Sequence, residues 1–319
     1  MNQLESLKRW TKVVADTGDW MEMQRFQPDE ATTNPSLIWK LFQKPDCDHY
    51  LQEAYGFFKS NHRRNPSLQE FLECVLVTVG KKILDIIPGR VSTEVDVRCS
   101  FDVASTLAQA YRLRDLYRAY AIPSGRVLMK IAATWEGIKA AEVLEREGIS
   151  CNLTLIFSRV QAIACAEAGV TLISPFVGRI FDWYSARNLW VAGEEDPGVR
   201  SVKSIYNYLK QYRYKTEIMG ASFRTVEQII ALAGCDRLTI APKLLAQLEA
   251  NTGPIAPQLQ ATQVEKSTIP EHPVTEKSFR WQLNEDPMAT EKLAEGIRLF
   301  ARDTQNLEEI LLHFLERKR

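Results

Sequence analysis

Short apolar runs rich in β-branched residues alternate along the chain with longer stretches in which apolar residues recur at helical spacing. This alternation is typical of parallel α/β proteins, in which a helix follows each strand. We predict eight strands, at residues 12–18, 30–36, 90–96, 126–132, 151–157, 170–176, 215–223 and 236–242.

Capping signals mark helices between these runs. Ser67 and Glu70 have the spacing of a capping box, and they predict the start of a long helix over 68–87. Thr225 and Gln228 repeat this spacing after the seventh run. The intervening segments are therefore helical, as a strand-helix repeat requires.

Eight strands with intervening helices predict a closed (β/α)8 barrel, which typically needs about 250 residues. The chain has 319 residues, so it carries extra segments. The gap 35–89 is long enough for three helices, and a Pro/Thr/Gln-rich stretch at 251–273 leads to a final helix near 288–317. We expect one domain, with 251–319 as a tail and final helix packed on the barrel. A doubly wound open sheet is the alternative, but the first turn, ADTGDW, lacks G-x-G-x-x-G.

Charge and composition exclude several classes of partner. The 40 Lys+Arg balance 40 Asp+Glu, which argues against a nucleic acid or an anionic membrane as the main partner. The most apolar stretch, from Phe71, covers half of the ~20 residues that a spanning helix needs. The start of the chain lacks a signal-peptide pattern, and the six cysteines form no C-x-x-C pair. We therefore expect a cytoplasmic protein that binds neither membrane nor nucleic acid.

Polar residues close most of the predicted strands. In a (β/α)8 barrel the chemistry lies at the carboxyl ends of the strands, so these residues are the candidates for a site. Because strand side chains alternate between two faces, Asn152 and Thr154 point to the same face of one strand, and Ser174 and Phe176 point to the same face of the next. The polar residues in chain order are Asp16, Thr32, Thr33, Asn34, Glu94, Asp96, Lys130, Asn152, Thr154, Ser174, Ser222 and Arg224.

Lys130 lies inside the apolar run VLMKIAA, where an ammonium group is costly to bury. Desolvation favours the neutral amine, which is a nucleophile suited to Schiff-base chemistry. The alternative is a lysine paired with Glu94 or Asp16, or one that reaches past the strand end. The pattern alone leaves both interpretations open.

Carboxylates and arginines complete the candidates. Asp16 precedes Gly18, so it either caps a turn or helix or transfers protons, while Glu94 on a short strand favours the proton-transfer role. Arg179 and Arg224 follow the sixth and seventh runs, where barrel phosphate sites often lie; surface ion pairs are the alternative. The four histidines lack metal-ligand spacing, so we expect no metal, and the nucleotide-binding fingerprints are absent.

Several of these segments resemble the transaldolases, the Schiff-base transferases of the pentose phosphate pathway, in their long form. ATTNPSLI at 31–38 and VLMKIAATWEGI at 127–138 are similar to the two signatures of that family, and the second contains the Schiff-base lysine. NLTLIFS, ISPFVGRI, MGASFR, GCDRLTIAP and DPMATEKLAEGIR are also similar. Glu30 departs from the first signature; we expect it to precede the strand and to lie away from the chemistry. The loop 188–195 is less typical.

The resemblance implies a (β/α)8 barrel with its C-terminal helix across the scaffold, no cofactor, sugar phosphates as substrates and a homodimer. It implies Lys130 as the nucleophile and Asp16 and Glu94 as proton-transfer groups. It further implies a substrate-binding set of Asn34, Asn152, Thr154, Ser174, Phe176, Arg179, Ser222 and Arg224, of which Arg179, Ser222 and Arg224 hold the phosphate.

Three functions compete at this stage. The first is transfer of a dihydroxyacetone unit from sedoheptulose 7-phosphate or fructose 6-phosphate to glyceraldehyde 3-phosphate or erythrose 4-phosphate. The second is a fructose-6-phosphate aldolase-type lyase with the same Schiff base; such shorter aldolases tend to carry Gln and Tyr in place of Glu94 and Phe176 and lack the tail. The third is a non-catalytic barrel scaffold, which the complete polar set argues against.

Overall fold

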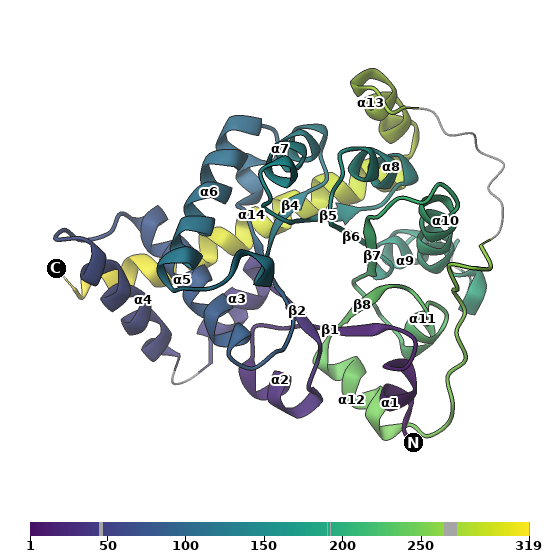
Figure 1. The fold of residues 1–319 in the computed structure, drawn as a ribbon, viewed down its shortest axis with the longest axis horizontal. Helices are drawn as coiled ribbons and strands as arrows, with labels where there is room; N and C mark the ends of the chain where they lie inside the picture. Colours follow the sequence, from purple (N-terminus) through teal and green to yellow (C-terminus); the bar gives the residue numbers. More distant parts are fainter. Residues whose placement is uncertain (45–46, 190, 192, 265–272, 319) are drawn as a thin grey trace.

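The computed structural model describes residues 1–44, 47–189, 191, 193–264 and 273–318. In this part of the chain, eight parallel strands close into a barrel in the order β1 to β8, and β1 pairs with both β2 and β8 (Figure 1). The predicted (β/α)8 barrel is confirmed. Its strands are β1 Lys12–Asp16, β2 Glu30–Thr32, β3 Val91–Glu94, β4 Val127–Ala132, β5 Cys151–Ile156, β6 Leu172–Pro175, β7 Glu217–Gly220 and β8 Arg237–Ile240.

Helices surround the barrel and connect its strands (Figure 1). The barrel region carries α1 Gln3–Leu7, α2 Trp20–Phe26, α3 Pro35–Phe42, α4 Asp48–Asn61, α5 Leu68–Leu84, α6 Val103–Ala119, α7 Trp135–Arg146, α8 Arg159–Glu167, α9 Gly178–Ser185, α10 Pro197–Gln211, α11 Val226–Ile230 and α12 Pro242–Ala250. The tail carries α13 Glu276–Glu285 and α14 Pro287–Glu316. Short 3-10 turns are η1 Val97–Cys99, η2 Ser124–Arg126 and η3 Gly193–Glu195.

The capping signals have the geometry that the sequence predicts. The side chain of Ser67 accepts a hydrogen bond from the backbone of Glu70, and the reciprocal bond completes a capping box at the start of α5. Thr225 caps α11 in the same position. The long helix ends at Leu84, three residues before the predicted end at 87, because the chain turns there toward Pro88 and β3.

The strands are shorter than the predicted runs, and in the second, third and eighth runs a residue near the predicted end is instead the capping residue of the next helix or turn. Asn34, which was predicted inside the second strand, accepts from the backbone N–H of Leu37 and starts α3, with Pro35 in its first turn. The three helices expected between 35 and 89 are α3, α4 and α5. Helix α13 was not predicted, and of the expected tail, residues 265–272 lie outside the described part.

Helix α14 crosses the molecule from α13 to the side of α4 (Figure 1). It packs against α3, α5, α9, β5 and η1. Its buried apolar face joins Leu155, Phe157 and Phe176 in a cluster at the carboxyl end of the barrel. The C-terminal helix therefore reaches the same end of the barrel as the predicted site.

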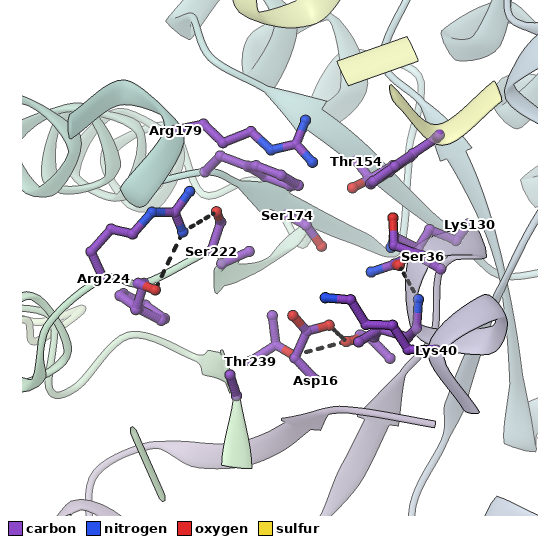
Figure 2. A pocket seen from close by; sticks show the side chains of 18 residues that line it. Asp16, Ser36, Lys40, Lys130, Thr154, Ser174, Arg179, Ser222, Arg224 and Thr239 are labelled. Carbon is purple, nitrogen blue, oxygen red and sulfur yellow. Dashed lines mark hydrogen bonds between the residues drawn. The ribbon is translucent and has the colours of Figure 1, made fainter. Parts of the chain in front are cut away.

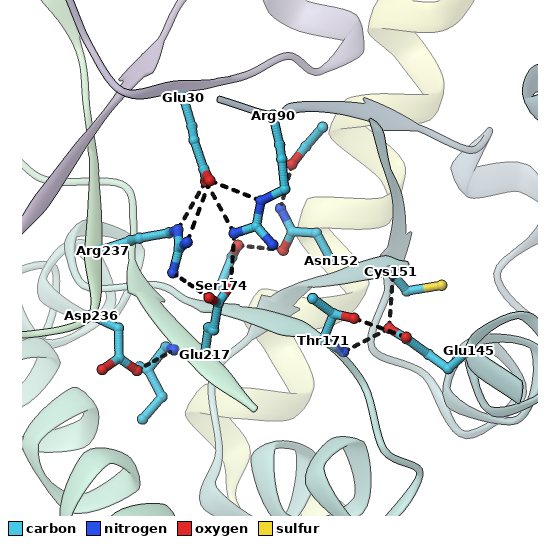
Figure 3. A network of polar contacts seen from close by, with 12 residues as sticks. Glu30, Arg90, Glu145, Cys151, Asn152, Thr171, Ser174, Glu217, Asp236 and Arg237 are labelled. Atoms are coloured by element: carbon cyan, nitrogen blue, oxygen red, sulfur yellow. Dashed lines mark hydrogen bonds and ion pairs between the residues drawn. The ribbon is translucent and has the colours of Figure 1, made fainter. Parts of the chain in front are cut away.

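The interior of the barrel is layered. A belt of four buried apolar side chains fills its middle: Val14, Leu128, Leu172 and Met219. Below this belt, at the amino ends of the strands, Glu30 pairs with Arg90 and Arg237, and Glu217 pairs with the same two arginines (Figure 3). We call these four residues the lower ion cluster. Glu30 is the first residue of β2 instead of preceding it, and it does lie at the end remote from the predicted chemistry.

None of the helices in the described part combines the length and the apolar character that a membrane span requires.

Candidate active site

The carboxyl ends of the strands open into a cavity of about 310 Å³ (Figure 2). Nine of the residues predicted for the site line it: Asp16, Asn34, Lys130, Thr154, Ser174, Phe176, Arg179, Ser222 and Arg224. The remaining two, Glu94 and Asn152, lie directly behind this lining and contact it. The predicted set is therefore brought together at one mouth of the barrel.

Lys130 and Glu94 face each other across neighbouring strands. The register of β3 and β4 places the two residues side by side, and Lys130 Nζ lies 3.0 Å from Glu94 Oε2. Lys130 Nζ also donates to the carbonyl oxygen of Thr33 at 3.0 Å. Both side chains are almost completely buried, at 6% and 2% exposed. The ion pair considered from the sequence is thus present, and it holds the amine at the wall of the cavity.

The Glu94 carboxyl is poorly solvated for a charged group. Burial raises its pKa, and the attraction of Lys130 opposes this shift. Its Oε1 has no hydrogen-bond partner among the described residues. A carboxyl with a raised pKa exchanges protons more readily near neutral pH than an exposed one.

Asp16 lines the same cavity as Lys130, at the end of β1 (Figure 2). It accepts a hydrogen bond from Thr32 Oγ1 at 3.0 Å, and Thr32 in turn contacts Thr239 at 2.8 Å. Burial raises the pKa of Asp16, and Lys130 is the strongest of the groups that oppose this. The alternative role as a helix cap is wrong for α2, because Asp19 is its capping residue. Two carboxyls in different surroundings thus flank one amine.

Polar side chains of β5 and β6 form the part of the cavity wall that follows Lys130 of β4 around the barrel. Asn152 lies one level below the lining, where its amide donates to Ser92 Oγ at 3.0 Å and its carbonyl oxygen accepts from Ser174 Oγ at 2.6 Å (Figure 3). Asn152 therefore positions Ser174. Thr154 is fully buried from bulk solvent, and its Oγ1 has no partner among the described residues. Such a hydroxyl is available to a bound molecule.

Arg179, Ser222 and Arg224 lie together on the opposite side of the cavity from Lys130 (Figure 2). Arg224 donates to Ser222 Oγ at 3.3 Å and pairs with both oxygens of Asp182, at 3.0 and 2.6 Å. Arg179 is different, because its Nη1 is buried and has no hydrogen-bond partner among the described residues. Burial lowers the pKa of Arg179, and the neighbouring Arg224 adds to this effect. Both arginines have guanidinium geometry suited to a phosphate.

A close backbone contact joins the start of α9, which carries Arg179, to the loop after β7, which carries Arg224. The N–H of Gly178 donates to the carbonyl oxygen of Ser222 at 2.5 Å, and a Cβ at position 178 would lie 2.1 Å from that oxygen. Ser222 itself has φ 62°, in the left-handed region that non-glycine residues rarely adopt. Helix α9 begins at Gly178, so its amino end also points toward this side of the cavity.

Sequence reasoning missed several lining residues. Ser36 and Lys40 come from the first turns of α3, Thr239 comes from β8, and Phe300 comes from α14. Capping by Asn34 indicates where α3 begins, which places Ser36 near the strand ends. No comparable signal indicates that Phe300, far along the chain, reaches the cavity.

Two further features that the sequence singled out are metal-ligand groups and the loop 188–195. Among the described residues, no group of three His, Cys, Asp or Glu side chains is arranged to hold a metal ion. Of the less typical loop 188–195, residues 190 and 192 lie outside the described part, and Leu189 and Val191 are exposed.

The fold and the site together define a (β/α)8 barrel with a buried lysine-carboxylate pair at the mouth where such barrels carry their chemistry. The family model described as Transaldolase/Fructose-6-phosphate aldolase matches residues 13–311. The chain therefore belongs to this family of aldolase-type transferases and lyases, whose substrates are sugar phosphates.

Proposed function

We propose that the protein is a transaldolase, which transfers a dihydroxyacetone unit from sedoheptulose 7-phosphate or fructose 6-phosphate to glyceraldehyde 3-phosphate or erythrose 4-phosphate. The observation that carries this proposal is Lys130, a buried amine 3.0 Å from a carboxyl oxygen at the mouth of the barrel. The proposed setting is the non-oxidative pentose phosphate pathway in the cytoplasm, without a cofactor.

In the proposed reaction, Lys130 attacks the ketone carbon of the donor and forms a protonated imine. Glu94 lies beside the amine and transfers the protons needed to form and dehydrate the carbinolamine. Asp16 then takes the proton from the hydroxyl next to the bond that breaks. The iminium accepts the electron pair, and the aldose phosphate leaves.

Substrate binding uses the remaining cavity residues. Asn34, Thr154 and Ser174 offer polar groups to the sugar hydroxyls, with Asn152 behind Ser174 and Phe176 as an apolar wall. Arg179, Ser222 and Arg224 hold the phosphate at the far side. We further propose that residues 1–319 form one domain, in which α14 packs on the barrel, and that the protein is a homodimer.

Glu94 and Phe176 favour transfer over the lyase alternative, because the shorter aldolases that resemble this family tend to carry Gln and Tyr there. The fructose-6-phosphate aldolase-type lyase would use the same Lys130 chemistry but release free dihydroxyacetone.

Borohydride trapping with fructose 6-phosphate tests the mechanism. A reduced three- or six-carbon adduct should map to Lys130 by mass spectrometry, and Lys130→Ala should abolish it. Trapping at another lysine in that variant would overturn the assignment. Addition of erythrose 4-phosphate then separates the two activities: sedoheptulose 7-phosphate indicates transfer, and free dihydroxyacetone indicates the lyase.

A further inference from the structure

Phe300 is the contribution of the C-terminal helix α14 to the cavity lining. Its side chain is 3% exposed. The centre of its ring lies 5.9 Å from Lys130 Nζ and 5.1 Å from Arg179 Cζ. The ring therefore borders the space between the amine on one side of the cavity and the arginines on the other.

This position matters for the reaction proposed above, on which the present inference rests. A ketose phosphate bound to Lys130 through its second carbon, with its phosphate at Arg179, spans the distance between these two groups. The third and fourth carbons, whose bond breaks, then lie beside the Phe300 ring. Phe176, whose ring centre is 5.3 Å from Arg179 Cζ, adds a second apolar surface.

Three features hold α14 at this position. One turn before Phe300, Gly296 lets the helix approach the barrel, since a Cβ there would lie 2.8 Å from Leu155 Cδ2 and 2.9 Å from Arg179 Nη1. Leu155 has φ 57° at a register shift in β5, and its side chain joins the apolar cluster of α14. One turn after Phe300, Asp303 accepts a hydrogen bond from Ser36 of the cavity lining.

We infer that Phe300 is a specificity-determining residue, which keeps water away from the reactive carbon and so favours transfer over release of dihydroxyacetone. Cleavage breaks the C3–C4 bond, Asp16 holds the proton of the C4 hydroxyl, and the electron pair forms an enamine on Lys130. In transfer, the third carbon of the enamine attacks an aldehyde carbon, and the proton on Asp16 goes to the aldehyde oxygen. In release, that carbon takes a proton from water, Asp16 neutralises the hydroxide, and hydrolysis of the iminium frees dihydroxyacetone and the amine.

Only release requires a proton donor at the third carbon, whereas both routes end with hydrolysis of an imine. When the aldose phosphate has left, water fills the vacated space except where side chains occupy it. An apolar ring offers that carbon no proton. Removal of the ring should therefore accelerate release without preventing formation of the imine.

The experiment compares Phe300→Ala with the parent protein, using fructose 6-phosphate and erythrose 4-phosphate. Two rates are measured: formation of sedoheptulose 7-phosphate, and formation of free dihydroxyacetone, which in heavy water carries one deuterium on carbon by NMR. We expect the ratio of release to transfer to rise at least tenfold, while borohydride still traps the Lys130 adduct. Phe300→Leu keeps apolar bulk and should stay within threefold of the parent.

Leu293→Ala is the matched control, because Leu293 lies on the same helix and in the same apolar cluster but outside the cavity lining. Its ratio should equal that of the parent. An unchanged ratio in Phe300→Ala, or an equal rise in Leu293→Ala, would overturn the role of Phe300. If the alanine variant does not fold, Phe300→Val provides the same comparison with a smaller truncation.

The outcome also separates this inference from the proposed function. Absence of a trapped lysine in the parent, or release as its main reaction, contradicts the proposed transaldolase activity itself. A parent that transfers and a Phe300→Ala variant with an unchanged ratio contradict only the role of the ring.

Discussion

The two arginines at the far side of the cavity should contribute unequally to phosphate binding. Arg224 already pairs with both oxygens of Asp182, and its side chain is 38% exposed. Arg179 has a buried Nη1 that lacks a partner among the described residues. A phosphate bound at the proposed site would satisfy Arg179, whereas at Arg224 it would share a guanidinium that Asp182 already neutralises. We therefore predict that Arg179→Ala is the more damaging substitution.

The size of the loss in kcat/KM expected for each variant follows from the surroundings of its arginine. A hydrogen bond between charged groups contributes about 1.5–3 kcal/mol, which corresponds to a loss of roughly 13- to 160-fold in kcat/KM for Arg179→Ala. An exposed ion pair contributes only about 0.2–1 kcal/mol, so Arg224→Ala should lose roughly 1.4- to 5-fold. The double variant should lose less than the product of the two factors, because both side chains contact one group.

Steady-state kinetics with fructose 6-phosphate and with unphosphorylated fructose measure these effects. The losses should appear with the phosphorylated sugar and be nearly absent with fructose. Inorganic phosphate should inhibit the parent competitively and should inhibit Arg179→Ala more weakly. Equal losses on both sugars would refute the reasoning, because the arginines would then support the barrel rim and not the phosphate.

Three further predictions concern protons and stability. Asp16→Asn should accumulate the trapped imine because cleavage stalls, whereas Glu94→Gln should slow formation of the imine. Each substitution should lower turnover by ~10²- to 10⁴-fold. Equal rates of imine formation in the two variants, measured by rapid-quench trapping, would contradict this division of roles. Lys40→Met should move the acidic limb of the pH profile of kcat to higher pH. Lys40 is one of the cations that lower the pKa of Asp16, and Asp16 must be ionised to act as a base. A shift of this limb to lower pH would contradict the prediction. Glu30→Gln should lower the free energy of unfolding by about 3 kcal/mol in urea titrations, since it breaks two buried pairs, while activity per folded molecule persists. Burial would raise the pKa of Glu30, but Arg90 and Arg237 outweigh burial and lower it. The stabilisation from these pairs is therefore present above pH 4.5, the ordinary pKa of a glutamate, and is lost as the pH falls through the lowered pKa. The Glu30→Gln variant should lack this pH-dependent part of the stability.

The order of the strands and the position of Lys130 at the mouth of the barrel were predictable, because both follow from the local pattern of apolar and polar residues. An ammonium inside an apolar run stands out, and the carboxyl ends of parallel strands necessarily meet at one mouth. Asn34 was predictable in position but not in its second role, since the same side chain caps α3 and lines the cavity.

Residues that reach the site through packing between distant elements were not predictable. The helical period of 288–317 indicates an apolar face on α14, but it does not indicate which strand that face covers, so Phe300 was missed. The pair between Arg224 and Asp182 joins the loop after β7 to helix α9, and the separation of these two segments depends on the close contact at Gly178. Helix α13 was missed because it follows a polar stretch that carries little periodic signal.

The layered interior of the barrel has a consequence for the order of events in the proposed reaction. The apolar belt and the lower ion cluster close the barrel from below, so the cavity communicates with solvent through the mouth that also admits substrate. The leaving aldose phosphate and the arriving aldehyde therefore need the same space and the same arginines. The first must depart before the second enters, which is a double-displacement scheme. Initial rates measured at several acceptor concentrations should give parallel double-reciprocal lines, and the architecture of the barrel floor is what enforces that pattern.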